Sequence, residues 1–290
     1  MRTVIPSSEL IINADGSIFH LHLKPEQVAD KIVLVGDPGR VTSMATLLDS
    51  RECDVWNREF HSVTGTYKGK RLTLVSHGIG CDNIDIVLNE LDALANIDFA
   101  TRTVRPRFRQ LTLVRVGTSG GLQPFVPVGT FVAAEKSIGF DGVLYFYKDS
   151  EQVRDLPLES ELIRQLGWKP AGLKPYAVAS DASLLEQIAG NDLVRGLTIA
   201  ANGFYGPQGR ELRLPLADPE LNRKIEAFEY GGSRITNFEM ESSALAGLSR
   251  LMGHRALTVC CIIAGRVQLN VEVDYAGGVM ELVRRVFERI

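Results

Sequence analysis

Short apolar runs rich in β-branched residues alternate along this chain with amphipathic stretches. Compact apolar runs predict buried strands, and apolar residues spaced three or four apart predict helices. Strands are expected at residues 31–35, 72–76, 111–116, 130–134, 177–180, 197–202 and 256–264. Helices are expected at residues 40–48, 83–96, 158–166, 184–189, 219–228, 240–252 and 278–290. The alternation of the two predicts an α/β fold.

Three of the expected strands run directly into glycine-containing segments. These are Gly36-Asp37-Pro38-Gly39, His77-Gly78-Ile79-Gly80 and Gly117-Thr118-Ser119-Gly120-Gly121. We interpret each segment as a turn at the carboxyl end of a strand, where α/β sheets bind ligands. None has the spacing of a dinucleotide fingerprint, and the sequence contains no phosphate-binding G-x-x-x-x-G-K-[ST]. A nicotinamide cofactor or ATP is therefore disfavoured.

Composition adds limits to this picture. The 290 residues are 45% hydrophobic and contain no linker or repeat, so we expect one domain. A formal net charge of −3 gives no reason to expect a nucleic-acid partner. Without a secretory signal or a long apolar run, we expect no membrane association and a cytoplasmic protein. The four cysteines form no C-x-x-C motif, as is typical of thiols in a reducing compartment.

Arginines and a hydroxyl group accompany two of the glycine segments. Arg40 follows the first, and Arg115 lies just before the third, which contains Thr118. Backbone N–H groups and arginines at strand ends favour a small anion. An arginine within a strand is costly to bury without a counter-charge. A bound phosphate would supply that charge to Arg115, and an ion pair with an acidic residue is the alternative.

Two glutamates flank a methionine where a helix is expected to begin, in Asn237-Phe238-Glu239-Met240-Glu241-Ser242. Acidic residues in a first helical turn are ordinarily explained by the helix dipole. Residues two apart on a helix do not share a face, so we expect different roles for the two carboxylates. One could accept hydrogen bonds from a vicinal diol such as ribose, and the other could brace the site.

The segment Phe204-Tyr205-Gly206-Pro207-Gln208-Gly209-Arg210 places an amide close to a guanidinium on a Gly/Pro-rich loop. Gln208 both donates and accepts hydrogen bonds, whereas Arg210 only donates. The pair suits a ring that carries carbonyl oxygens beside an N–H, such as uracil, with Phe204 and Tyr205 as an apolar wall. A solvated turn with a surface arginine is the alternative interpretation of this loop taken alone.

The ordered motifs together resemble those of the nucleoside phosphorylase family, and specifically its uridine phosphorylase branch. To the segments above they add Arg58-Glu59-Phe60, and they span roughly residues 20–266. The resemblance implies a single domain over residues 1–290, with residues 1–18 as an N-terminal extension. It also implies three α/β/α layers around a central mixed, twisted and partly barrel-like sheet.

The family pattern, carried onto this sequence, implies three groups of binding residues. Phosphate is expected to be held by Gly36, Arg40, Arg115 and Thr118, with Arg58 reaching in from the adjoining subunit. Ribose is expected to be held by Glu241 and Met240, with Glu239 nearby and His20 crossing between subunits to the 5′-hydroxyl. Uracil is expected to meet Gln208 and Arg210, near Phe204 and Ile263, with Arg266 behind the base loop.

The resemblance further implies a homo-oligomer with shared sites, at least a dimer and, by family likeness, a hexamer. No cofactor is expected, because phosphate is a co-substrate, and no metal, because His20-x-His22 lacks a third ligand. Some relatives hold a monovalent cation at the dimer interface through a glutamate equivalent to Glu59 and a serine. Asn83 stands at that serine's position, so cation binding is left open.

Two departures from the family pattern bear on function. The purine branch carries an aspartate in its late strand-end loop, whereas this chain has Ile262-Ile263-Ala264-Gly265-Arg266 there, which argues against purines. The segment 101–109 is an insertion with four arginines for which the pattern implies no role, and we expect a solvated loop. Those arginines are Arg102, Arg105, Arg107 and Arg109.

These observations predict reversible phosphorolysis of uridine to uracil and ribose 1-phosphate, in pyrimidine salvage. The expected catalytic residues are Arg115, Arg210, Gln208 and Glu241, and deoxyuridine and thymidine are not ranked against uridine. Arg115→Ala is expected to abolish the reaction and leave the fold intact. The alternatives are a purine nucleoside phosphorylase, a hydrolytic nucleosidase of the same fold and a non-catalytic nucleoside-binding protein.

Overall fold

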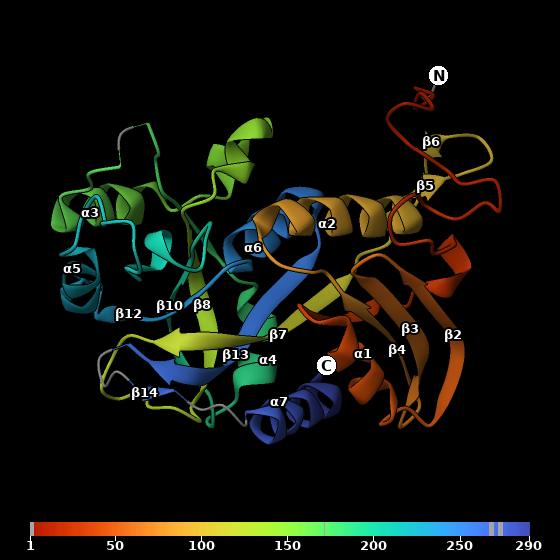
Figure 1. Cartoon of the computed structure of the whole chain (residues 1–290). Helices are drawn as coiled ribbons and strands as arrows, with labels where there is room; N and C mark the ends of the chain where they lie inside the picture. The colour runs from red at the N-terminus through yellow and green to blue at the C-terminus, as the bar shows by residue number, and fades with distance from the viewer. Residues whose placement is uncertain (1–2, 171, 267–269, 272–274) are drawn as a thin grey trace.

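One mixed sheet runs through the computed structural model of the chain, which describes residues 3–170, 172–266, 270–271 and 275–290 (Figure 1). Its strands are β1 (Lys31–Val35), β2 (Ser50–Asn57), β3 (Phe60–Tyr67), β4 (Lys70–Ser76), β7 (Thr112–Gly121), β8 (Phe131–Gly139), β9 (Tyr176–Ala179), β10 (Val194–Ala200), β11 (Glu229–Tyr230), β12 (Ser233–Glu239), β13 (Arg255–Gly265) and β14 (Asn270–Val271). The order is β11-β12-β10-β8-β13-β7-β1-β4-β3-β2, with β9 beside β8 and β14 beside β13.

Helices cover both faces of this sheet, as Figure 1 shows. The α-helices of the described residues are α1 (Pro38–Ala45), α2 (Cys81–Asn96), α3 (Leu156–Leu166), α4 (Ala182–Ala189), α5 (Leu221–Ala227), α6 (Ser242–Met252) and α7 (Ala276–Arg289). Along β1, Ile32 and Leu34 pack in the cluster of α2 and α6, whereas Val33 and Val35 pack in that of α1, α4 and α7. Burial on both faces explains why β1 is a continuous apolar run.

Part of the sheet closes on itself. β7 pairs with β13 along one edge and, through Gly120 and Gly121, with Phe238 and Asn237 of β12 along the other. The strands β7, β13, β8, β10 and β12 thereby form a ring. The expected fold, three layers around a mixed and partly barrel-like sheet, is confirmed.

The turn expected at residues 117–121 is wrong, because these residues continue strand β7. Close approach of neighbouring backbone explains at least one of the glycines. A Cβ at Gly121 would lie 2.5 Å from the carbonyl oxygen of Val126. Glycine in a strand often marks such an approach. The first two glycine segments do follow β1 and β4, as expected.

Besides the two-residue strands β11 and β14, two parts of the sheet were absent from the expected elements: the hairpin of β2 and β3, and strand β12. In β2 exposed and half-buried residues alternate, which is typical of an edge strand with few core residues. In β12 the polar Thr236, Asn237 and Glu239 are buried, which hides the apolar pattern of a core strand.

The segment 101–109 contains the second strand of a small hairpin, in which β5 (Ile97–Asp98) pairs with β6 (Thr103–Val104). Arg102 donates hydrogen bonds to the carbonyl oxygens of Ile5 at 2.8 Å and Pro6 at 3.0 Å. Arg109 pairs with Asp30 at 2.5 Å. The expectation of a merely solvated loop is therefore wrong for these two arginines, which fasten the N-terminal segment and the start of β1.

None of the described helices combines the length and the apolar character that crossing a bilayer requires.

Candidate functional site

A cavity of about 990 Å³ lies where the ends of β1, β4, β12 and β13 meet the bend of β7. Its volume is in the range of small-molecule sites. Most of the residues predicted for the site line it, from five separate segments of sequence. They are Gly36, Arg40, Arg115, Thr118, Phe204, Gln208, Arg210, Glu239, Met240, Glu241, Ile263 and Arg266.

The anion end of the cavity is built by the start of α1. The carboxylate of Asp37 caps this helix by accepting the Gly39 N–H at 2.8 Å. Arg40 follows in the first turn and lines the cavity, and no described residue accepts a hydrogen bond from its guanidinium. Burial, and then the charge of Arg115, lower the pKa of Arg40. The charge of Asp37 opposes these effects but does not outweigh them. A cation at the positive end of a helix thus forms no ion pair with a described carboxylate, and an anion in the cavity would supply that partner.

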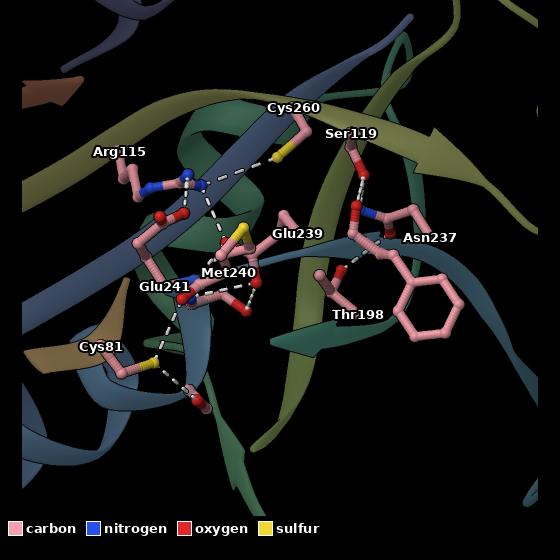
Figure 2. Close-up of polar contacts among 12 residues, drawn as sticks. Cys81, Arg115, Ser119, Thr198, Asn237, Glu239, Met240, Glu241 and Cys260 are labelled. Carbon is pink, nitrogen blue, oxygen red and sulfur yellow. Dashed lines mark hydrogen bonds and ion pairs between the residues drawn. The ribbon is translucent and has the colours of Figure 1, made fainter. Parts of the chain in front are cut away.

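Arg115 of β7 is buried between two glutamates. Its Nη1 lies 2.9 Å from Glu239 Oε2, and its Nη2 donates to Glu241. Figure 2 shows the three side chains converging. Burial alone would lower the pKa of Arg115, but Glu241 and Glu239 outweigh burial and raise it.

The expectation that phosphate provides the counter-charge of Arg115 is therefore wrong. The protein itself provides it, and one guanidinium between two carboxylates leaves a formal excess of negative charge. Arg40, with no described partner, is the residue that makes this end of the cavity attractive to an anion. Arg115 and Thr118 still line the same end and can reach a bound group there.

His77 holds Arg115 from the side opposite the glutamates. Its Nε2 accepts a hydrogen bond from Arg115 Nε at 3.2 Å. Burial, followed by the charge of Arg115, lowers the pKa of His77 well below its usual value. The ring is therefore neutral, with Nε2 as the acceptor and the hydrogen on Nδ1. Sequence reasoning assigned this histidine only to a glycine turn.

The two glutamates have different contacts, as expected from their spacing. Glu239 accepts the backbone N–H of Glu241 at 2.9 Å and the hydroxyl of Ser242 at 2.6 Å, so it braces the start of α6. Glu241 accepts the Gly80 N–H at 2.7 Å and lines the cavity beside Met240. Burial raises the pKa of Glu239, against the opposing charge of Arg115. Glu241 therefore has fewer described hydrogen-bond partners than Glu239 and keeps lone pairs for a donor in the cavity.

A preformed loop makes the opposite end of the cavity. Gln208 is 2% exposed, and its Oε1 accepts a hydrogen bond from Arg210 Nη1 at 2.6 Å. The Arg210 guanidinium lies 3.9 Å from the centre of the Phe204 ring. Arg266 Nη2 donates to the carbonyl oxygens of Gln208 and Gly209, at 3.0 and 3.2 Å. The alternative of a solvated turn is therefore wrong for Gln208, although Phe204 is half exposed at the rim.

Burial, and then the charge of Arg266, lower the pKa of Arg210 to about 10. Two arginines beside one buried amide make this end of the cavity rich in hydrogen-bond donors. Such a site favours a ring that carries carbonyl oxygens.

His20 and Arg58 do not line the cavity of their own chain. His20 bonds to Glu90 of α2 with its Nδ1 at 2.7 Å. Arg58 is exposed in the turn between β2 and β3, with a φ of 54°. Both positions are free to face a second copy of the chain.

Several cavity residues were not predicted as ligands, among them Asp37, Ser119 and Phe238. All three lie inside the motifs quoted above, but strand β12, to which Phe238 belongs, was not expected. Glu59 and Asn83 also line the cavity, 3.4 Å apart. Within the described ranges, no group of three or more His, Cys, Asp or Glu side chains is placed to hold a metal.

Comparison with known proteins agrees with this geometry. A uridine phosphorylase of Thermococcus kodakarensis is 28% identical over 267 residues, covering 90% of this chain and 82% of the relative. A purine nucleoside phosphorylase of Aliivibrio fischeri is 28% identical, covering 84% of each chain. The solved Trypanosoma brucei nucleoside phosphorylase, which shows uridine phosphorylase activity, aligns with a TM-score of 0.87 at 28% identity, over 97% of this chain and 98% of that one.

The sequence profile of the phosphorylase superfamily matches residues 30–288, nearly the whole chain. That range includes the anion end, the glutamate pair and the base loop of the cavity. The chain therefore belongs to the phosphorylase superfamily and is an enzyme of the nucleoside phosphorylase type.

Proposed function

We propose that this protein is a uridine phosphorylase, which cleaves uridine with phosphate to uracil and ribose 1-phosphate. One observation carries the use of phosphate rather than water: Arg40 lies in the cavity at the first turn of α1 and forms no ion pair with a described carboxylate. A hydrolytic nucleosidase would not need this cation, because water is a neutral nucleophile. Curated relatives named uridine phosphorylase support the assignment.

The proposed reaction transfers the ribosyl group without a covalent enzyme intermediate. A phosphate oxygen bonds to C1′ while the C1′–N1 bond breaks, and the electrons of that bond move into the uracil ring. The uracil anion then takes up the proton that hydrogen phosphate brought to the reaction. Arg40 and Arg115 position phosphate at one end of the cavity, which makes the attack effectively intramolecular. Glu241 holds the ribose between the two ends. No step requires a nucleophilic side chain.

The base loop stabilises the leaving uracil. Arg210 donates toward the carbonyl oxygens, on which negative charge develops, and the amide of Gln208 has a donor left for the ring after accepting from Arg210. Preorganised donors of this kind are typically worth about 10²–10³ in rate each. Arg266 keeps the loop in place through its bonds to the backbone.

A purine nucleoside phosphorylase is the second candidate, because such a relative is 28% identical to this chain. In the described part of the strand-end segment, residues 262–266, no carboxylate is available to protonate a purine. We therefore favour uridine over inosine or adenosine.

Uracil release from uridine, measured with and without phosphate, tests the proposed function. We expect release to require phosphate and to yield ribose 1-phosphate. Release of free ribose without phosphate would identify a hydrolase. Binding of uridine without any release would identify a non-catalytic binding protein.

We also propose that His20 and Arg58 complete the site of a neighbouring subunit, so that the active unit is at least a dimer. Arg58→Ala chains and Arg40→Ala chains should each be nearly inactive alone. After subunit exchange, half of the dimers in an equal mixture are mixed and carry one intact site, which predicts about a quarter of wild-type activity. No recovery, despite exchange demonstrated by mass labelling, would contradict a shared site.

A further inference from the structure

His20 is held by a buried carboxylate outside the cavity. Glu90 Oε1 lies 2.7 Å from His20 Nδ1 and accepts the His20 backbone N–H at 2.9 Å. Glu90 Oε2 accepts the Leu21 backbone N–H at 2.8 Å. The Glu90 side chain is 12% exposed and that of His20 is 26% exposed. One carboxylate thus fixes both the backbone and the ring of this histidine.

This arrangement determines which ring nitrogen of His20 can meet a ligand. A carboxylate only accepts hydrogen bonds, so Nδ1 donates to Glu90 and Nε2 remains for an outside partner. Phe19 and Phe60 pack edge-on against the imidazole, with ring centres 4.7 and 6.1 Å away. The ring plane is therefore set by contacts on several sides.

The same segment is tied to the turn that carries Arg58. Asn57 Nδ2 donates to the His20 carbonyl oxygen at 2.8 Å, and Trp56 Nε1 donates to the Arg58 carbonyl oxygen at 2.9 Å. Non-glycine residues with positive φ occur in both segments, at 52° for His22 and 54° for Arg58. Such backbone strain persists where surrounding contacts over-determine it, often at functional sites.

We propose that Glu90 is a positioning residue for the reaction: with Asn57 it holds His20 and Arg58 as one unit that is presented to a second copy of this chain. His20 Nε2 then meets the 5′-hydroxyl of the nucleoside in that copy, and Glu90 fixes the direction of this nitrogen. This inference rests on the proposed function. Glu90 itself does not touch the substrate.

A substrate lacking one hydroxyl isolates this contact. Phosphorolysis of uridine and of 5′-deoxyuridine is compared at saturating phosphate for wild type, Glu90→Gln and His20→Ala. Glu90→Gln replaces an acceptor oxygen by an amide that cannot accept from all three N–H groups. Loss of an orienting partner typically costs about 10–100-fold. We expect kcat/KM to fall about 10-fold with uridine and less than about 2-fold with 5′-deoxyuridine.

Asp92→Asn is the matched control. Asp92 lies on the same helix and also bonds to a histidine, His254, at 3.1 Å, away from His20. It should lower activity on both substrates equally or not at all. The double variant His20→Ala/Glu90→Gln should lose no more uridine activity than His20→Ala, because the two residues act as one. Size-exclusion chromatography and melting curves verify that each variant is folded and assembled.

An equal loss on both substrates for Glu90→Gln would show a merely structural role and overturn the proposal. Equal kcat/KM of the wild type for the two nucleosides would also overturn it, because His20 would then not read the 5′-hydroxyl. Neither result would contradict the proposed function, which is tested separately by phosphate-dependent uracil release from uridine by the wild type.

Discussion

Removal of the Arg115 side chain should lower the free energy of unfolding far more than removal of the Arg40 side chain, although both arginines line one cavity. Arg115→Ala leaves Glu239 and Glu241 buried without their shared cation. Arg40→Ala leaves no described carboxylate unpaired. This contrast replaces the expectation, formed from the sequence, that Arg115→Ala would leave the fold intact.

The magnitudes follow from burial. Breaking a buried ion pair by removing one partner costs about 3–5 kcal/mol. That is a large fraction of the roughly 5–15 kcal/mol that stabilises a typical protein. A cation in the first turn of a helix opposes the helix dipole, so Arg40→Ala should change the free energy of unfolding by no more than about 0.3–1 kcal/mol, in the stabilising direction.

The cost of Arg115→Ala should depend on pH. Without Arg115, burial and the charge of Glu241 raise the folded-state pKa of Glu239 further above its unfolded value. The folded variant then binds a proton more tightly than the unfolded chain, so its stability falls as pH rises through the folded pKa of Glu239. The deficit relative to wild type should therefore be smaller at pH 5 than at pH 8.

Urea unfolding of both variants and wild type, in phosphate-free buffer at the two pH values, measures these differences. Phosphate titrations of uracil release should show kcat/KM for phosphate lowered about 10²–10³-fold in Arg40→Ala. Equal urea midpoints for Arg115→Ala and wild type at pH 8 would refute the assigned counter-charge. An unchanged phosphate dependence of Arg40→Ala would refute the anion site.

Three further results are expected. Uridine should exceed cytidine and inosine in kcat/KM by as much as about 10⁴–10⁵. Gln208→Ala should impair uridine cleavage more than phosphate binding. A kcat/KM for inosine comparable to that for uridine would contradict the base assignment. Burial raises the pKa of the Cys260 thiol to about 12. Iodoacetamide at pH 8 should therefore alkylate the half-buried Cys53 well before Cys260, and mass spectrometry can follow the order of alkylation. A Cβ at Gly117 would lie 2.5 Å from Arg115 Nη1. Because Glu239 and Glu241 hold this guanidinium in place, Gly117→Ala should lower the free energy of unfolding by about 1–3 kcal/mol, as measured by urea titration.

Much of the fold could be predicted because its core strands are buried on both faces. β1 and β4 are compact apolar runs that end in a glycine turn, and both signals are local. Strand β12 gives no such signal, because Asn237 is satisfied inside the barrel by Thr198 and Ser119 of other strands. Polar residues that are buried through distant partners look like loop residues in a single sequence.

The same distinction separates the predicted and unpredicted parts of the site. The residue types indicated which side chains gather at the cavity, because arginine, glutamate and glutamine at strand ends have few roles other than binding a ligand. They could not indicate pairing: Arg115 and Glu241 are far apart in sequence and meet only because β7 bends across to β12. Once Arg115 is paired, Arg40 is the arginine at the anion end that forms no ion pair with a described carboxylate. The phosphate dependence of Arg40→Ala is therefore the measurement that links this fold to its chemistry.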